Sequence, residues 1–146
     1  MALATISPSL ERAIRRSCVL ARERGQPQAG TSHLLAALLD DPDARDVLEA
    51  CAVDHGALHD ALARSLGQGA AQAAADPQPD EDYRRVVQKA VTHVQASGRT
   101  SVSGANLLAA LVADGRSPAA ARLTAQGPSR LDLANYMAHG IRKARP

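Results

Sequence analysis

Apolar residues recur every three or four positions along most of the chain, which is the spacing of one face of a helix. The first such stretch begins at Ser7 and Pro8, a typical helix start, because serine caps free N–H groups and proline suits the first turn. Gly25 is a typical stop. The pattern therefore predicts a helix between these residues. Its inward side chains are predicted to be Leu10, Ile14, Cys18 and Ala21.

The remaining helices follow from the same periodicity and from similar punctuation. Asp41 with Pro42, and Ser117 with Pro118, repeat the cap-and-proline start, and Ser129 with an acid three residues later resembles a capping box. After the first helix, the predicted helices cover about residues 31–39, 42–51, 54–66, 81–97, 103–113, a stretch beginning at 118, and 129–140. In the 81–97 helix, the predicted inward side chains are Tyr83, Val87, Val91 and Val94.

The chain contains an internal repeat. His33-Leu-Leu-Ala-Ala-Leu38 returns 73 residues later as Asn106-Leu-Leu-Ala-Ala-Leu111. The offset of 73 holds upstream without a gap, and it becomes 75 downstream after an insertion between Leu111 and Pro118. Such agreement along both halves indicates one four-helix unit present twice.

The repeat defines the expected organisation. Repeat one covers residues 7–66, a linker rich in Gly, Pro and Ala covers 67–80, repeat two covers 81–140, and 141–146 form a tail or the start of a further linker. Neither half alone would bury much surface, so we expect the halves to pack on each other. The predicted fold is all-α: an eight-helix bundle of two pseudo-two-fold-related four-helix repeats.

Composition supports a helical fold and adds a charge asymmetry. Phe and Trp are absent and the tyrosines are Tyr83 and Tyr136, so the core must consist of Ala, Leu, Val and Ile. The net charge is only +2, yet residues 83–146 carry ten Lys or Arg against two Asp or Glu. A basic half attracts acidic partners or other anions. No aromatic residues interleave with the basic ones, as single-strand binding requires, so we do not expect nucleic acid as a partner.

The sequence gives little sign of catalysis. It contains no phosphate-binding loop, no hydrolase nucleophile elbow and no His-Glu-x-x-His motif, so we expect a non-enzyme without a cofactor of its own. His55 and His59 have the i,i+4 spacing that places two imidazoles on one helix face. Two ligands without a third are a weak metal signal, and a solvated polar face is the favoured interpretation.

Apolar stretches and the first residues of the chain bear on its expected cellular location. No stretch approaches the roughly 18 apolar residues of a membrane span, and residues 1–6 lack the features of a signal peptide. We therefore expect a cytoplasmic protein that does not enter a membrane. Cys18 and Cys51 lie within apolar helical patterns, which favours reduced core cysteines over a disulfide.

Three long segments resemble the N-terminal domain of the Clp unfoldases, and that of ClpA most of all. They cover residues 93–108, 129–140 and 44–54, and begin His93-Val-Gln-Ala-Ser-Gly-Arg99, Ser129-Arg-Leu-Asp-Leu133 and Ala44-Arg-Asp-Val-Leu-Glu-Ala50. The resemblance extends over nearly the whole chain. It implies a non-catalytic recognition domain ahead of two ATPase modules, which would bind ATP and are absent from this sequence.

The resemblance also implies partners. ClpA-like domains dock the adaptor ClpS, which delivers substrates with destabilising N-terminal residues, and they also meet substrate proteins directly. The motor then feeds the ClpP peptidase. The alternative is a stand-alone regulator of the same type that binds an adaptor, an acidic partner or nucleic acid.

By resemblance, the docking surface includes the end of the first helix, the following loop and part of the 81–97 helix. The candidate protein-binding residues are Gln26, Gln28, Ser32, Arg85 and Lys89. Ser32 and Ala105 stand where family members commonly carry glutamates, and Pro27 stands where ClpA has an acid used for ClpS. Missing acids weaken electrostatic docking, so we expect altered contacts with ClpS and no phosphoarginine recognition.

Overall fold

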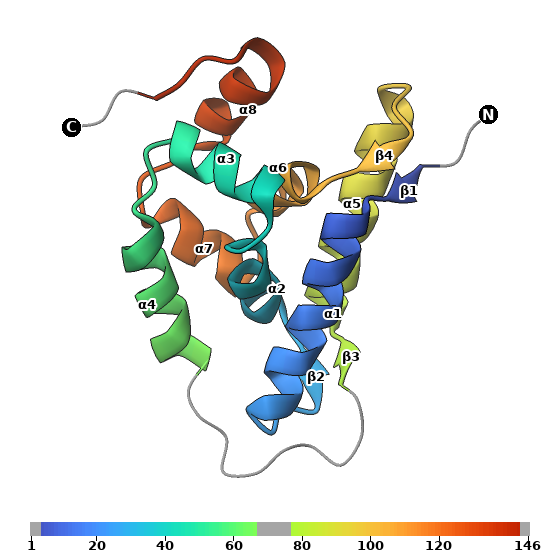
Figure 1. The fold of residues 1–146 in the computed structure, drawn as a ribbon, viewed down its shortest axis with the longest axis vertical. Coiled ribbons are helices and arrows are strands. Elements are labelled where there is room, and N and C mark those ends of the chain that lie inside the picture. The colour runs from blue at the N-terminus through green and yellow to red at the C-terminus, as the bar shows by residue number, and fades with distance from the viewer. Residues whose placement is uncertain (1–3, 67–76, 144–146) are drawn as a thin grey trace.

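A computed structural model describes residues 4–66 and 77–143 of the chain. Within these residues the fold consists of eight helices and four strands of two residues each (Figure 1). Repeat one, extended by the strand β1 (Thr5–Ile6) just before its predicted start, contains α1 (Pro8–Glu23), β2 (Gln28–Ala29), α2 (Thr31–Leu38), α3 (Pro42–Ala50) and α4 (His55–Leu66). Repeat two, extended by the strand β3 (Gln78–Pro79) from the predicted linker, contains α5 (Glu81–Ala96), β4 (Ser101–Val102), α6 (Gly104–Asp114), α7 (Pro118–Thr124) and α8 (Arg130–His139).

The predicted all-α class and the predicted helices are confirmed, because the local start signals operate as expected. The serine or aspartate before each helix-starting proline accepts a hydrogen bond from a backbone N–H of the first turn. These bonds run from the Leu10 N–H to Ser7 in α1, from the Ala44 N–H to Asp41 in α3, and from the Ala120 N–H to Ser117 in α7. Most of the predicted linker, residues 67–76, lies outside the described part of the chain.

Leu10, Ala21, Tyr83 and Val94 are buried as predicted, but the centre of each inward face lies one position before the other four predicted residues. The fully buried side chains are Leu10, Ala13, Ser17 and Ala21 in α1, and Tyr83, Val86, Ala90 and Val94 in α5. Ile14, Cys18, Val87 and Val91 are only half-buried at the edge of the stripe. Smaller residues occupy the centre of each face because α1 packs closely on α2, and α5 on α6. The shift is the same in both repeats.

The strands were not predicted, and they join the two repeats reciprocally. β1 pairs in parallel with β4, with Thr5 opposite Ser101, and β2 pairs in parallel with β3, with Gln28 opposite Gln78. Adding 73 to either residue of repeat one gives a strand residue of repeat two, so one pair is the symmetry mate of the other. Each repeat therefore holds the segment before the second helix of its partner. Two-residue strands leave no periodicity in a sequence, which explains why they were missed.

The core lies around α2 and α6, whose leucines are almost completely buried. These leucines are Leu34, Leu35, Leu38, Leu39, Leu107, Leu108 and Leu111. A polar contact also joins the repeats, because the Ser17 and Tyr83 hydroxyls lie 2.6 Å apart between α1 and α5. Burial raises the pKa of Tyr83 to about 12. No described helix combines the length and the apolar character that crossing a membrane requires.

A second close approach joins α3 to the start of α6. The buried carboxylate of Asp41 accepts the Ala44 N–H at 3.0 Å and lies directly above Gly104. A Cβ atom on Gly104 would lie 2.0 Å from Asp41 Oδ2. The carboxylate is held by its capping bond, so a side chain at Gly104 would have to displace a buried charged group.

This contact predicts that Gly104→Ala destabilises the domain by about 2 kcal/mol, which urea unfolding would measure. Gly56→Ala is the matched control. Gly56 lies in the first turn of α4, and its Cβ would meet Asp54 Oδ1 at an ordinary 3.5 Å. Alanine is the better helix former, so the control should gain about 0.5 kcal/mol. Equal midpoints for the two variants would contradict the close approach.

Candidate protein-docking site

Three of the five candidate residues lie around the loop between α1 and α2. Gln26 and Gln28 are exposed, and Ser32 is half-buried in the first turn of α2. The loop meets the start of α5, because β2 pairs with β3 and the Asp80 N–H donates to the Ala29 carbonyl at 2.9 Å. The structure thus brings the loop of repeat one against the first residues of repeat two.

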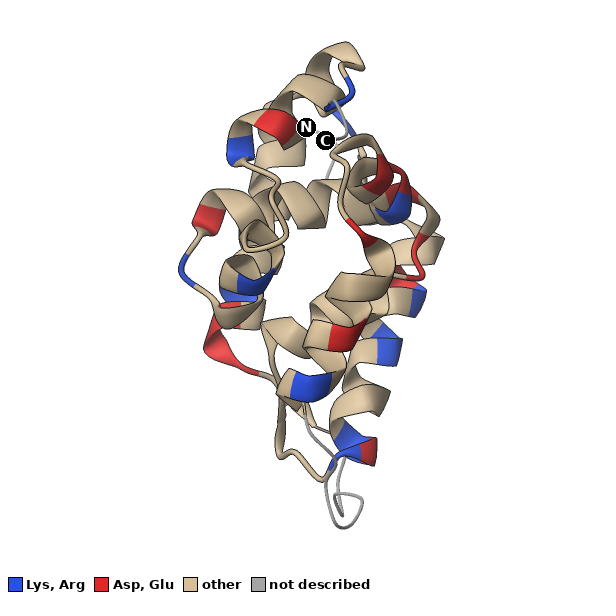
Figure 2. Cartoon of the chain, turned by 90° about the vertical axis from the view of Figure 1, so that its left-hand side faces the viewer, with Lys and Arg blue, Asp and Glu red and all other residues tan. Residues whose placement is uncertain are grey.

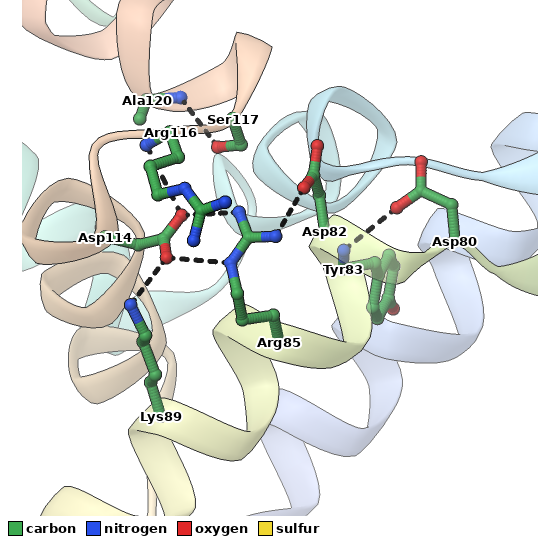
Figure 3. Close-up of polar contacts among 9 residues, drawn as sticks. All are labelled: Asp80, Asp82, Tyr83, Arg85, Lys89, Asp114, Arg116, Ser117 and Ala120. Carbon is green, nitrogen blue, oxygen red and sulfur yellow. Dashed lines mark hydrogen bonds and ion pairs between the residues drawn. The ribbon is translucent and has the colours of Figure 1, made fainter.

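The other two candidates, Arg85 and Lys89, converge on one buried carboxylate (Figure 3). Arg85 donates from Nε and Nη2 to Asp114, with both distances 2.9 Å, and from Nη1 to Asp82 at 2.6 Å. Lys89 Nζ donates to Asp114 Oδ1 at 2.7 Å, and the Arg116 N–H contacts Asp114 Oδ2 at 3.4 Å. The Asp114 side chain is 0% exposed, so these cations stabilise the end of α6.

These contacts shift the pKa values of Asp114 and Arg85. The hydrogen bond from Arg85 is the main cause that holds the pKa of Asp114 well below its usual range, and the hydrogen bond from Lys89 adds to it. The same contact with Asp114 raises the pKa of Arg85. Arg85 is largely engaged inside the domain, with 21% of its side chain exposed, whereas Lys89 retains 49%. Lys89 therefore has more surface to offer a partner.

The weak metal candidates have other partners. His55 is half-buried, and its Nε2 lies 3.0 Å from the Leu39 carbonyl oxygen, so it links α4 to the end of α2 instead of lying on a purely solvated face. His59 is exposed, 3.5 Å from Asp60. Within residues 4–66 and 77–143, no group of three or more His, Cys, Asp or Glu could hold a metal ion. Cys18 and Cys51 are free thiols, and burial raises the pKa of Cys51.

A groove between α5, α6 and α8 was missed by sequence reasoning. Its volume is about 380 Å³. The floor is mostly apolar, and the rim is basic. The floor includes Ala109, Ala110, Val112, Ala113, Leu133 and Met137, and the rim includes the exposed Arg99 and Arg130, together with His93 and Lys89, whose charge is paired with Asp114. No acidic residue lines this repeat-two groove.

Repeat one has a smaller groove at the equivalent place, between α1, α2 and α4. Its volume is about 120 Å³. The offsets of 73 and 75 relate the linings: Lys89 corresponds to Arg16, His93 to Leu20, Ala109 to Ala36, Ala110 to Ala37, Met137 to Leu62 and Ala138 to Ala63. The sequence alignment of the repeats could have indicated this pairing, but only the packing shows that the lining is open. The repeat-one groove also includes Asp40 and His59, so its chemistry is different.

An apolar groove of this kind can accept the apolar face of a helix from another protein. A basic rim favours acidic residues beside that face, because complementary charge speeds association and excludes basic partners. On the face shown in Figure 2, basic and acidic positions are mixed. The lining of the repeat-two groove, by contrast, combines an apolar floor with basic residues and no acidic ones.

Comparisons with known proteins agree with one another. A model of the Clp repeat (R) N-terminal domain matches residues 5–126. A ClpA homologue of Fuscovulum blasticum is 39% identical over 144 residues, which cover 95% of this chain and 18% of the relative. The chain thus spans less than a fifth of the length of that relative.

Solved structures share the fold. The N-domain of ClpV from Vibrio cholerae has a TM-score of 0.76 at 19% identity, covering 91% of this chain and 82% of that one. The Hsp104 N-terminal domain from Candida albicans has a TM-score of 0.74 at 16% identity, covering 99% and 97%. A complex of the ClpV N-domain with a VipB peptide has a TM-score of 0.74 at 20% identity, covering 92% and 85%.

The ion cluster of Asp114 predicts a specific acid sensitivity. Asp114→Asn should lower the free energy of unfolding at pH 7 by about 2 kcal/mol, because charge-assisted hydrogen bonds are lost. With its pKa lowered in the folded state, Asp114 stabilises the fold above about pH 4, and this contribution disappears as the pH falls further. The variant should therefore show a flatter stability profile between pH 4 and pH 2.

The control for this prediction is Asp46→Asn, at an exposed position of α3. It should leave both the stability at pH 7 and the acid limb nearly unchanged. Chemical unfolding followed by circular dichroism at each pH would measure both variants. If the two variants had the same acid limb as the parent chain, Asp114 would not be the group that titrates.

Proposed function

The chain belongs to the Clp repeat N-terminal domain family, and from this premise we propose that it is the partner-docking domain of a ClpA-like unfoldase. Domains of this family are non-catalytic and bind substrates or adaptors. In the proposed parent protein, ATPase modules outside this sequence would bind ATP, unfold the delivered protein in the cytoplasm and pass it to ClpP. The domain would contribute recognition alone.

The observation that carries the proposal is the repeat-two groove with its apolar floor and basic rim. Its floor consists of small and medium side chains, mostly alanine, so a partner helix could approach the backbone of α6 and α8 closely. Arg99 and Arg130 lie at the rim and are exposed. The matching partner segment is a helix with an apolar stripe flanked by Asp or Glu.

We also propose that the adaptor ClpS docks at the loop between α1 and α2, through Gln26, Gln28 and Ser32. Gln28 lies in β2, which pairs with β3, and Gln26 and Ser32 lie on either side of this strand. The loop lacks the acid that ClpA uses at the position of Pro27, so a basic adaptor surface would meet amide and hydroxyl groups instead. Neutral contacts gain less from electrostatic steering, which predicts weaker docking than in an acid-bearing relative.

The groove predicts discrimination between two synthetic helices that share one leucine stripe. The helix with glutamates beside the stripe should bind the domain, and the helix with lysines should bind at least tenfold more weakly. Fluorescence anisotropy with labelled peptides would give both dissociation constants. Rising salt should weaken the binding of the acidic helix to the domain, because the rim charges are exposed and become screened.

A pair of symmetry-related variants locates the binding surface. Ala138 lines the repeat-two groove, Ala63 is its mate in the repeat-one groove, and both are exposed. Ala138→Asp should weaken the binding of the acidic helix at least tenfold, because the aspartate places a like charge in the groove. Ala63→Asp should leave the affinity for the acidic helix unchanged. If the two substitutions weakened binding of the acidic helix equally, the binding surface could not be assigned to the repeat-two groove.

The ClpS proposal predicts that restoring an acid in the loop strengthens docking. Pro27→Glu should bind ClpS of the same organism several-fold more tightly than Pro27→Gln, which has the same loss of proline without the charge. Isothermal titration calorimetry would measure both. If neither variant nor the parent domain bound ClpS at high micromolar concentration, the adaptor proposal would be rejected.

A further inference from the structure

The two repeats begin their second helices with different capping chemistry. In repeat two, Ser103 and Asn106 form a complete capping box: the Ser103 N–H donates to Asn106 Oδ1 at 2.9 Å, and the Asn106 N–H donates to Ser103 Oγ at 3.3 Å. In repeat one, the Gly30 N–H donates to His33 Nδ1 at 3.0 Å. Glycine has no side chain to accept a hydrogen bond from the His33 N–H, so the capping box of repeat one contains only the bond from the Gly30 N–H to the His33 side chain.

A side chain at this cap of repeat one would be crowded. A Cβ atom on Gly30 would lie 3.2 Å from Asp80 Oδ2. Asp80 is itself fixed, because its carboxylate caps α5 through the Tyr83 N–H and its N–H donates to the Ala29 carbonyl. The start of α2 therefore depends on an imidazole where the start of α6 depends on an amide.

An imidazole can accept this hydrogen bond only when it is neutral. Nδ1 must then be unprotonated, and the ring proton must lie on Nε2. His33 Nε2 is buried without a hydrogen-bond partner in the described part of the chain, so no second hydrogen bond holds the ring. Protonation converts Nδ1 from an acceptor into a donor, and a donor cannot face the Gly30 N–H.

The charged groups that act on His33 are Arg24, after α1, and Asp80, ahead of α5. Burial, followed by repulsion from Arg24, lowers the pKa of His33, and attraction to Asp80 only partly opposes this. The unfolded histidine titrates near pH 6.5. With a lowered pKa in the folded state, the stabilisation by His33 is fully present above about pH 6.5 and declines as the pH falls below it.

We propose that His33 is a proton-sensitive latch for the repeat-one loop, defined as residues 24–30, and that repeat two lacks such a latch. At neutral pH the neutral imidazole holds Gly30 and keeps β2 against β3. In acid the latch opens, and the loop that carries Gln26 and Gln28 loosens. The latch follows from the capping geometry, whereas its consequence for adaptor docking rests on the proposed function.

The latch can be tested by NMR on the whole domain. In the parent chain, the amide protection of Gly30 should fall at least fivefold between pH 7.5 and pH 5.5, while that of Ser103 stays constant. In His33→Asn, which copies Asn106 of repeat two, both amides should be independent of pH. The ring ¹⁵N shifts at pH 7.5 should show the Nε2–H tautomer.

Three results would overturn the latch: constant protection of Gly30 in the parent chain, the same loss in His33→Asn, or an Nδ1–H tautomer. ClpS titrations at both pH values separate the latch from the proposed function. Binding that weakens in acid for the parent but not for His33→Asn supports both. No binding at pH 7.5 rejects adaptor docking, while the amide measurements still decide the latch.

Discussion

The burial of α2 and α6 is the constraint on which the rest of the structure depends. Both helices are short, and their leucines, such as Leu34 and Leu108, have 0% exposure. Leucine-rich faces of this kind have to be covered by packing from more than one direction. The helices of one repeat cannot do this, so α3 packs on α6 and α7 packs on α2 across the repeats. The strand pairs β1–β4 and β2–β3 also join the two repeats.

The centre of the domain consists of packed apolar side chains. The two repeats differ around it, in their grooves, their capping residues and their ion pairs. The groove of repeat two is about 380 Å³ and that of repeat one about 120 Å³. His33 and Asn106 occupy the same capping position, where the imidazole can gain a proton and the amide cannot. Asp114 joins Arg85 and Lys89 at the end of α6, at the two-residue insertion by which repeat two differs from repeat one. Two copies of one fold thus present two different surfaces.

Most of the helices and their caps could be predicted, because those signals are local. Ser7, Asp41 and Ser117 act within three residues of their own positions. The inward face of α1 could not be placed correctly, since apolar residues at neighbouring positions such as Ala13 and Ile14 leave the stripe ambiguous until α2 packs against it. Of the candidate site, the sequence indicated Lys89 as a surface cation, but its buried partner Asp114 lies 25 residues away.

The sequence by itself determined that the chain is helical, that one unit occurs twice and where each helix begins, because capping and periodicity depend on residues close together along the chain. Tertiary structure alone decided which alanines line an open groove, why Gly104 lacks a side chain and a side chain at Gly30 would be crowded, and which cations pair with buried carboxylates inside the domain. Each of these depends on distances between segments far apart in sequence, such as Asp41 above Gly104 and Asp80 beside Gly30. Such distances are set only when both repeats close around α2 and α6.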